Sequence, residues 1–262
     1  MDMEASDETD GDVTIDNPVR EQRHRAAHAL VQALQASGAR SLPPKIGTSL
    51  TPAITLALLQ DSMPAILIGD GLPTPAAAAA VQQGLREQGV QAQVEVQDIM
   101  GFPALQIALA TVDDTQRLAD LVMSRLPEPH AASHRLRTTL ATAGVKAINM
   151  RVQGGVIEVG GISATDACTL LVILGGHLPD RIELEDWHHL EALAEMLSAA
   201  LHTASGRVID VVADPACSTC SATRTYEITL GPVAPEQARR LADAVESAVT
   251  PTSPEQQPVR CR

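Results

Sequence analysis

Aromatic side chains are almost absent from this chain of 262 residues, which has one Phe, one Tyr and one Trp. Lysine is nearly as rare, since Lys45 and Lys146 are the only two. The hydrophobic core must therefore consist of aliphatic side chains. The shortage of aromatic rings also removes the stacking platforms on which many proteins hold single-stranded nucleic acids.

Positive charge is in short supply as well. The formal net charge is −13 at pH 7. Binding to nucleic acids depends on neutralising phosphates with Lys and Arg. We therefore expect no nucleic-acid partner.

Long hydrophobic runs are missing. One of the longest, "TLLVIL" at 169–174, is far too short to cross a bilayer. The chain opens with the acidic stretch "MDMEASDETDGD", whereas a secretory leader has a basic and then an apolar region. We expect a cytoplasmic protein without membrane contact, in which cysteines are thiols or metal ligands rather than disulfides.

An internal duplication dominates what is present. Residues 24–38 and 130–144 match at a shift of 106 positions, with His, His, Leu, Leu and Gly in corresponding places. The same shift aligns "GDGLP" at 69–73 with "GGHLP" at 175–179. A finer repeat relates 105–120 to 226–243. Internal repeats of this kind indicate supersecondary units that bury their apolar faces against one another.

Four tandem αββα units account for the repeats. Each consists of an amphipathic helix ending near Gly, two short strands joined by a turn, and a second helix. Since such a unit cannot close its own core, we expect the units to pair. The sequence predicts an α+β fold of two similar domains, 17–127 and 128–250, each a four-stranded antiparallel sheet with helices on one face. The acidic segment 1–16 and the proline-containing segment 251–262 are predicted to be disordered tails.

The third unit shows the pattern most clearly. Its first helix is predicted over 129–143, with Gly144 as the left-handed terminator. A hairpin turns at "QGG", and Ser163 caps the next helix. In the fourth unit the strands are predicted at 207–213 and 224–230, and by alignment a helix is expected over 62–71.

The motif "DPACSTC" at 214–220 carries Cys217 and Cys220 in a C-x-x-C spacing. The helix predicted from about 187 to 203 and the strand that returns from it have similar lengths. The turn that holds the cysteines should thus lie beside the start of this helix, where His188 and His189 are found. Cys261 in the C-terminal tail could reach the same place.

Three sulfurs and one imidazole suit tetrahedral zinc. Because adjacent helical residues point about 100° apart, only one of the two histidines is expected to bind. The candidate ligands are Cys217, Cys220, His189 and Cys261 around one structural zinc. An unmetallated turn, with no cofactor, remains the simpler interpretation.

The segment "HLE" at 189–191, followed by "ACSTC", resembles the H-x-E…P-C-x-x-C signature of zinc-dependent nucleoside and nucleobase deaminases. The resemblance implies that His189, Cys217 and Cys220 hold zinc. It also implies that Glu191 shuttles protons for a zinc-activated water. Ala216 separates Pro215 from Cys217, which departs from the signature.

Three functions remain open at this stage. The leading hypothesis is a non-catalytic cytoplasmic interaction or regulatory protein with a protein partner, because no arrangement of acids, bases and nucleophiles stands out. The second is a zinc enzyme of deaminase type. The third is a sensor that binds a small ligand between its paired halves. Homo-oligomerisation is compatible with each.

Overall fold

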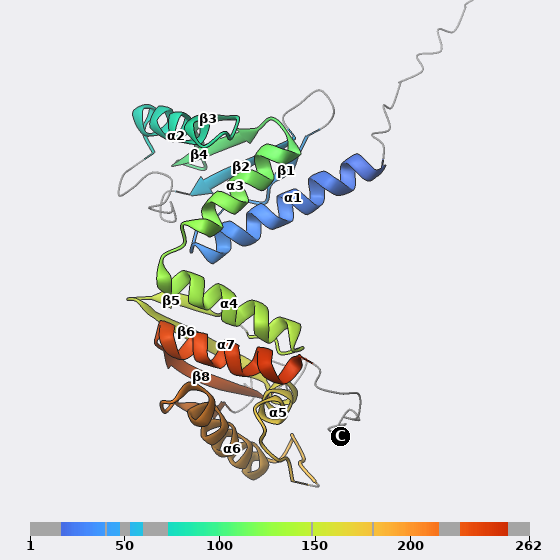
Figure 1. The fold of residues 1–262 in the computed structure, drawn as a ribbon. Coiled ribbons are helices and arrows are strands. Elements are labelled where there is room, and N and C mark those ends of the chain that lie inside the picture. The colour runs from blue at the N-terminus through green and yellow to red at the C-terminus, as the bar shows by residue number, and fades with distance from the viewer. Residues whose placement is uncertain are drawn as a thin grey trace, which may run out of the picture. The chain divides into compact units, whose positions relative to one another are not determined.

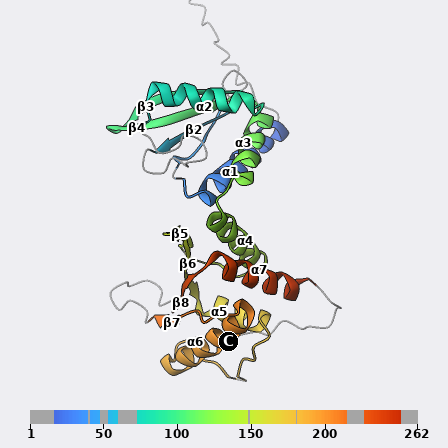
Figure 2. The ribbon, with the colours of Figure 1, turned by 60° about the vertical axis from the view of Figure 1, so that its left-hand side comes forward.

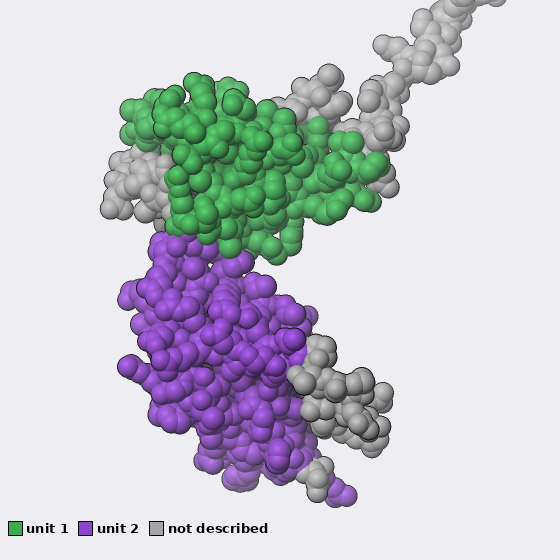
Figure 3. All heavy atoms as spheres, in the orientation of Figure 1, with its two compact units in different colours: residues 1–35, 39–125 green, residues 36–38, 126–262 purple. Residues whose placement is uncertain are grey.

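The computed structural model describes residues 17–39, 41–47, 53–59, 73–147, 149–179, 181–214 and 226–250. It has an α+β fold with two similar halves (Figure 1). The chain divides into two compact units, one formed by residues 1–35 and 39–125 and the other by 36–38 and 126–262 (Figure 3). No described helix is long and apolar enough to span a bilayer.

The first half contains one four-stranded antiparallel sheet in the order β1-β2-β4-β3. Its described helices are α1 (Asn17–Ala36), α2 (Pro75–Glu87) and α3 (Val112–Ser124), and its strands are β1 (Lys45–Ile46), β2 (Ile54–Leu59), β3 (Ala92–Ile99) and β4 (Phe102–Leu109).

The second half repeats this topology with a sheet in the order β5-β6-β8-β7. Its helices are α4 (Glu128–Thr142), α5 (Ala164–Ile173), α6 (Trp187–Ser205) and α7 (Pro235–Val249), and its strands are β5 (Arg151–Gln153), β6 (Val156–Ser163), β7 (Val211–Asp214) and β8 (Glu227–Val233). The edge strand β7 runs beside α6 (Figure 2).

Each sheet buries one face under helices. In β2, the side chains of Ile54, Leu56 and Leu58 are buried, and the residues between them are partly exposed. This alternation is what a sheet covered on one side requires. The core is aliphatic: among the described residues its largest fully buried side chains are all Leu and Ile.

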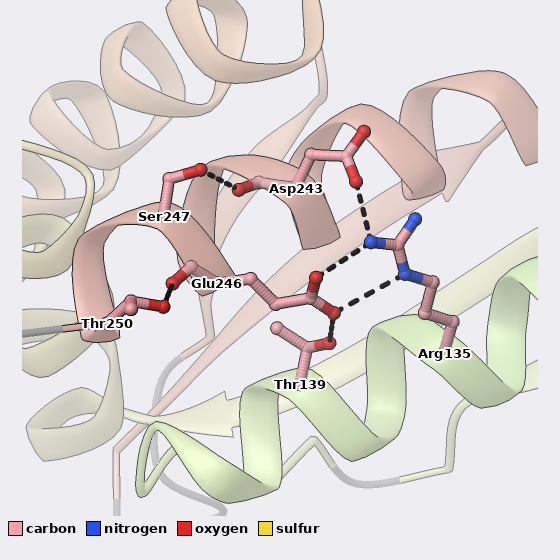
Figure 4. Close-up of polar contacts among 6 residues, drawn as sticks. All are labelled: Arg135, Thr139, Asp243, Glu246, Ser247 and Thr250. Carbon is pink, nitrogen blue, oxygen red and sulfur yellow. Dashed lines mark hydrogen bonds and ion pairs between the residues drawn. The ribbon is translucent and has the colours of Figure 1, made fainter.

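Polar contacts join α4 to α7 in the second half. Arg135 on α4 binds both Asp243 and Glu246 on α7, and Thr139 donates a hydrogen bond to Glu246 (Figure 4). A further ion pair joins Arg239 to Glu128. Since early residues of α4 meet early residues of α7, the two helices run parallel.

The predicted fold class is confirmed. Gly144 follows α4 with φ 82°, and the hairpin between β5 and β6 turns at Gly154 and Gly155, both with positive φ. Ser163 caps α5 by accepting a hydrogen bond from the N–H of Asp166. The helix expected over 62–71 and both predicted tails lie outside the described residues.

The strands of the fourth unit start four and three residues later than predicted, at Val211 and Glu227. Helix α6 continues to Ser205 and ends in the left-handed Gly206, so β7 starts only at Val211. Strand β8 continues through Gly231 and Pro232 to Val233, beyond the predicted end at 230. The pairing of β6 with β8 continues past these two residues. Val159 and Gly231 are not paired, but Gly160 pairs with Leu230 on one side of them and Glu158 with Pro232 on the other.

Candidate functional site: a groove between helix α6 and edge strand β7

A groove with a cavity volume of about 710 Å³ lies between α6 and β7. Helix α6 contributes one stripe of side chains with helical spacing. Strand β7 contributes Val211, Val212 and Ala213, and Val208 comes from the segment that leads into the strand. The lining residues are Trp187, Glu191, Ala194, Glu195, Ser198, Ala199, His202, Val208, Val211, Val212 and Ala213.

The opposite face of α6 holds the helix in place. Leu193, Leu197 and Leu201 are completely buried in the core of the second half, at the spacing of an amphipathic helix. Asp186 caps the helix by accepting a hydrogen bond from the N–H of His188 at 2.8 Å. The groove-lining stripe is therefore presented by a fixed helix.

Several apolar side chains at the groove are exposed. The exposed fractions are 70 % for Val208, 54 % for Val212 and 38 % for Trp187. Trp187 is the chain's only tryptophan. Exposed β-branched and aromatic side chains beside a concave surface are typical of a binding surface.

Among the described strands, β7 pairs only with β8, so no described strand lies along its other edge. The N–H of Gly231 donates to the carbonyl of Asp210, which fixes the alternation of hydrogen bonds between β7 and β8. In this register Val212 and Asp214 bond toward β8, while the N–H and C=O groups of Val211 and Ala213 point toward the groove. Among the described residues, no hydrogen bond from another element reaches these outward groups.

The first half differs at the corresponding position. The buried helix residues Ala78, Val81 and Leu85 correspond to Ala194, Leu197 and Leu201, so Gln82 corresponds to Ser198. The side-chain oxygen of Gln82 accepts a hydrogen bond from the edge N–H of Val94 in β3 at 3.3 Å. The shorter Ser198 instead donates to the carbonyl of Ile209 at 3.2 Å, before β7 begins.

The sheet register makes Val94 and Ala213 equivalent, because β3 pairs Ala92 with Leu109 and β7 pairs Val211 with Leu230. The edge N–H satisfied by a helix side chain in the first half thus has no described partner in the second. Helix α6 also begins about one turn earlier than α2, and this extra turn supplies Trp187.

The predicted metal site is described only in part. Cys217, Cys220 and Cys261 lie outside the described residues. Ala213 in β7 belongs to a buried cluster with Leu190 near the start of α6, and Tyr226, just before β8, packs against this cluster. Within the described ranges, no group of three or more His, Cys, Asp and Glu side chains is arranged to hold a metal ion.

The two histidines at the start of α6 have different surroundings. His189 accepts a hydrogen bond at Nδ1 from the N–H of Glu183 at 3.2 Å. His188 is 89 % exposed, and its Nδ1 lies 3.6 Å from a carboxylate oxygen of Glu191. Glu191, the residue that the deaminase resemblance makes a proton shuttle, is thus placed beside His188 and lines the groove.

A second cavity, of about 390 Å³, lies on the sheet of the first half. It is lined by Lys45, Gly47, Thr55, Gln93, Glu95, Gln106 and Ala108. These residues come from, or directly follow, all four strands. Its polar lining is that of a solvated open sheet face.

The chain matches no protein-family model, and no curated protein or solved structure shows significant similarity to it. The functional role of the candidate site therefore has to be argued from its geometry alone. Sequence reasoning missed the groove because it placed the fourth unit's first strand at 207–213. With that placement, Val208 belongs to the strand and Ala213 ends it.

Proposed function

We propose that this is a non-catalytic interaction protein that binds an extended segment of a protein partner between α6 and β7. The observation that carries the proposal is the pair of outward-facing backbone positions, Val211 and Ala213, along one wall of a groove. A segment bound there adds a fifth strand to the sheet.

Strand addition uses main-chain hydrogen bonds for affinity and side-chain pockets for specificity. At this edge, two residues with outward groups offer two N–H donors and two C=O acceptors to the incoming strand. The side chains of that strand alternate between the groove under α6 and the open face of the sheet. Outward backbone groups and a groove for side chains, the two features that strand addition uses, thus lie next to each other at β7.

Unpaired sheet edges are normally protected in native proteins. The first half follows this rule, since Gln82 binds the edge N–H of Val94. The second half has Ser198 in the same place on its helix, and this residue bonds elsewhere. At equivalent edge positions, the helix of the first half thus binds an edge N–H, whereas among the described residues the second half leaves this N–H without a partner, which supports a binding role for the edge of β7.

A hydrogen-exchange experiment tests the proposal. Ten-residue peptides selected from a random displayed library against the intact protein serve as probes. We expect the selected peptides to slow amide exchange at Val211 and Ala213, because both N–H groups become bonded. Ser198→Gln should abolish the slowing that the peptides produce, since Gln would bind the edge N–H of Ala213 as Gln82 binds that of Val94 in the first half.

Two control variants keep the test specific. Ser198→Ala removes the hydroxyl but leaves the groove open, so it should retain peptide binding. Gln82→Ser makes the reverse exchange in the first half and should leave binding at β7 unchanged. Selected peptides that bind without altering exchange at Val211 and Ala213, or that bind Ser198→Gln equally well, would overturn the proposal.

A further inference from the structure

We infer that the segment bound at β7 is cationic, with Lys or Arg on both sides of a small apolar residue. This inference rests on the proposed strand addition and specifies its partner. It follows from the charges and the sizes of the side chains around the groove.

The described residues that line the groove include two glutamates and no Lys or Arg. Glu191 and Glu195 line it from α6, and Asp210 and Asp214, two residues before and after Val212, share the open face of the sheet with Val212. Among the described residues, Glu195 and Asp210 have no ion-pair partner, and Glu191 has only His188, at 3.6 Å. A basic segment would supply the missing countercharges.

Cross-strand neighbours project their side chains to the same face of a sheet. The residues of an added strand opposite Val211 and Ala213 therefore point toward α6, where Glu191 and Glu195 lie. The residue between them lies on the open face, opposite Val212, which is 54 % exposed. A basic–apolar–basic triplet such as Arg-Val-Arg fits this register.

Small side chains leave room for long basic ones. Ala194, Ser198 and Ala199 form the helix wall beside the two glutamates. The aliphatic stems of Lys and Arg can pack along such a wall while their charged ends reach the carboxylates. A short acidic or amide side chain at these positions would leave the cavity unfilled and the glutamates without a cation.

The whole chain adds to this preference. A net charge of −13 attracts cationic segments over distances longer than a contact and speeds their association at low salt. Electrostatic steering of this kind weakens as ionic strength rises. Salt dependence is accordingly a direct readout of the inference.

Three synthetic peptides that differ at two positions form the test. Each has the sequence Thr-Thr-X-Val-X-Thr-Thr, blocked at both ends, with X as Arg, Gln or Glu. The fluorescence of Trp187, the only tryptophan and a residue of the groove, reports binding to the full chain. Amide exchange at Val211 and Ala213 reports strand addition independently.

We expect the Arg peptide to bind about tenfold more tightly than the Gln peptide, since each of two exposed ion pairs contributes a factor of about three. The Glu peptide should bind more weakly than both. Raising the salt from about 0.05 to about 0.5 M should reduce the advantage of Arg over Gln.

Variants assign the charge effect to the groove. Glu191→Gln and Glu195→Gln should each weaken binding of the Arg peptide by about two- to fivefold and leave the Gln peptide unaffected. Glu21→Gln, an equal change of charge on an exposed position of α1, should have no effect. Equal affinity for the three peptides, with protection of Val211 and Ala213, would overturn the cationic partner but retain strand addition.

Other occupants of the groove give distinct results. Absence of protection with every peptide would reject strand addition itself. Slow exchange at both amides in the free monomer would show that a segment of this chain fills the edge. Protection that increases with protein concentration, in step with sedimentation, would assign the edge to a second copy. Either result would overturn the inference of a cationic partner.

Discussion

Arg135 and Glu246 link helices α4 and α7 through two hydrogen bonds, from Nε at 3.3 Å and from Nη2 at 2.7 Å. Thr139 donates to the same carboxylate at 2.8 Å, and Asp243 lies 2.7 Å from Nη2 of Arg135. The hydrogen bond from Arg135, followed by that from Thr139, lowers the pKa of Glu246 below its ordinary value of 4.5. The ionised form of Glu246 therefore contributes to the pairing of the helices.

Replacing this carboxylate should make stability depend less on pH. Because the pKa of Glu246 is lower in the folded protein, its stabilisation is present above the unfolded pKa. It is lost as the pH falls through the folded pKa. Glu246→Gln should lower the melting temperature at pH 7 by about 1–2 °C, a small effect because the group is exposed. The two melting temperatures should converge as the pH falls below 4.5, the ordinary pKa of Glu.

Thermal melts followed by circular dichroism between pH 3 and pH 7 measure this effect. Glu21→Gln, at an exposed position of α1, provides the matched control and should melt as the wild type at every pH. A difference between wild type and Glu246→Gln that persists unchanged at pH 3 would contradict the assigned role of the carboxylate.

The hairpin between β3 and β4 contains a residue in an unfavourable conformation. Met100 has φ 55° and Gly101 has φ 85°, between the paired residues Ile99 and Phe102. Two-residue turns with positive φ at both positions strongly prefer Asn-Gly. A Met side chain in the left-handed region clashes with its own backbone, whereas Asn tolerates that conformation. Met100 is 95 % exposed, so its side chain contributes almost no burial in compensation.

We therefore predict that Met100→Asn stabilises the protein by about 0.5–1 kcal/mol. Gly101→Ala should do the opposite and destabilise by about 1–2 kcal/mol, since it adds a Cβ at positive φ. Urea denaturation at pH 7 compares the three proteins. Equal midpoints for Met100→Asn and wild type would show that the turn does not strain the methionine.

Local signals explain how much of the fold the sequence could predict. Ser163, Gly144 and the Gly154–Gly155 pair act within a few residues of their own position, and the structure places the expected cap, terminator and turn at them. The repeat of 106 residues then extended this local pattern to the topology of both halves. Where one strand starts depends instead on how far α6 continues, and the predicted end at about 203 did not use Gly206, a left-handed terminator like Gly144.

Predicting the groove from the sequence would require knowing contacts between residues that are far apart in the chain. Its key difference is that Gln82 reaches a strand edge and Ser198 does not. That difference becomes visible only when helix and strand are paired in space. Neither the exposure of Trp187 nor the outward direction of the Val211 N–H follows from a periodicity of side chains.

The zinc hypothesis remains a prediction, and the start of α6 provides its sharpest test. In neutral histidine one ring nitrogen accepts and the other carries the proton. Since His189 accepts at Nδ1 from Glu183, its Nε2 is protonated, and zinc binding at His189 requires this bond to break. His188 is exposed, and Glu191 can accept from its Nδ1–H. A carboxylate in this position orients a histidine whose Nε2 binds zinc.

If Cys217 and Cys220 hold zinc with a histidine of α6, elemental analysis should find about one equivalent in the purified protein. Cys217→Ser should remove the metal and lower the melting temperature, because the free energy of structural metal binding contributes to folding. His188→Asn should release more zinc than His189→Asn, whereas the sequence hypothesis expects the reverse order. Glu191→Gln should retain the metal, and it would abolish turnover only in a deaminase. A protein that contains no zinc, takes up none, and melts unchanged after Cys217→Ser would contradict the zinc hypothesis and leave the motif a turn.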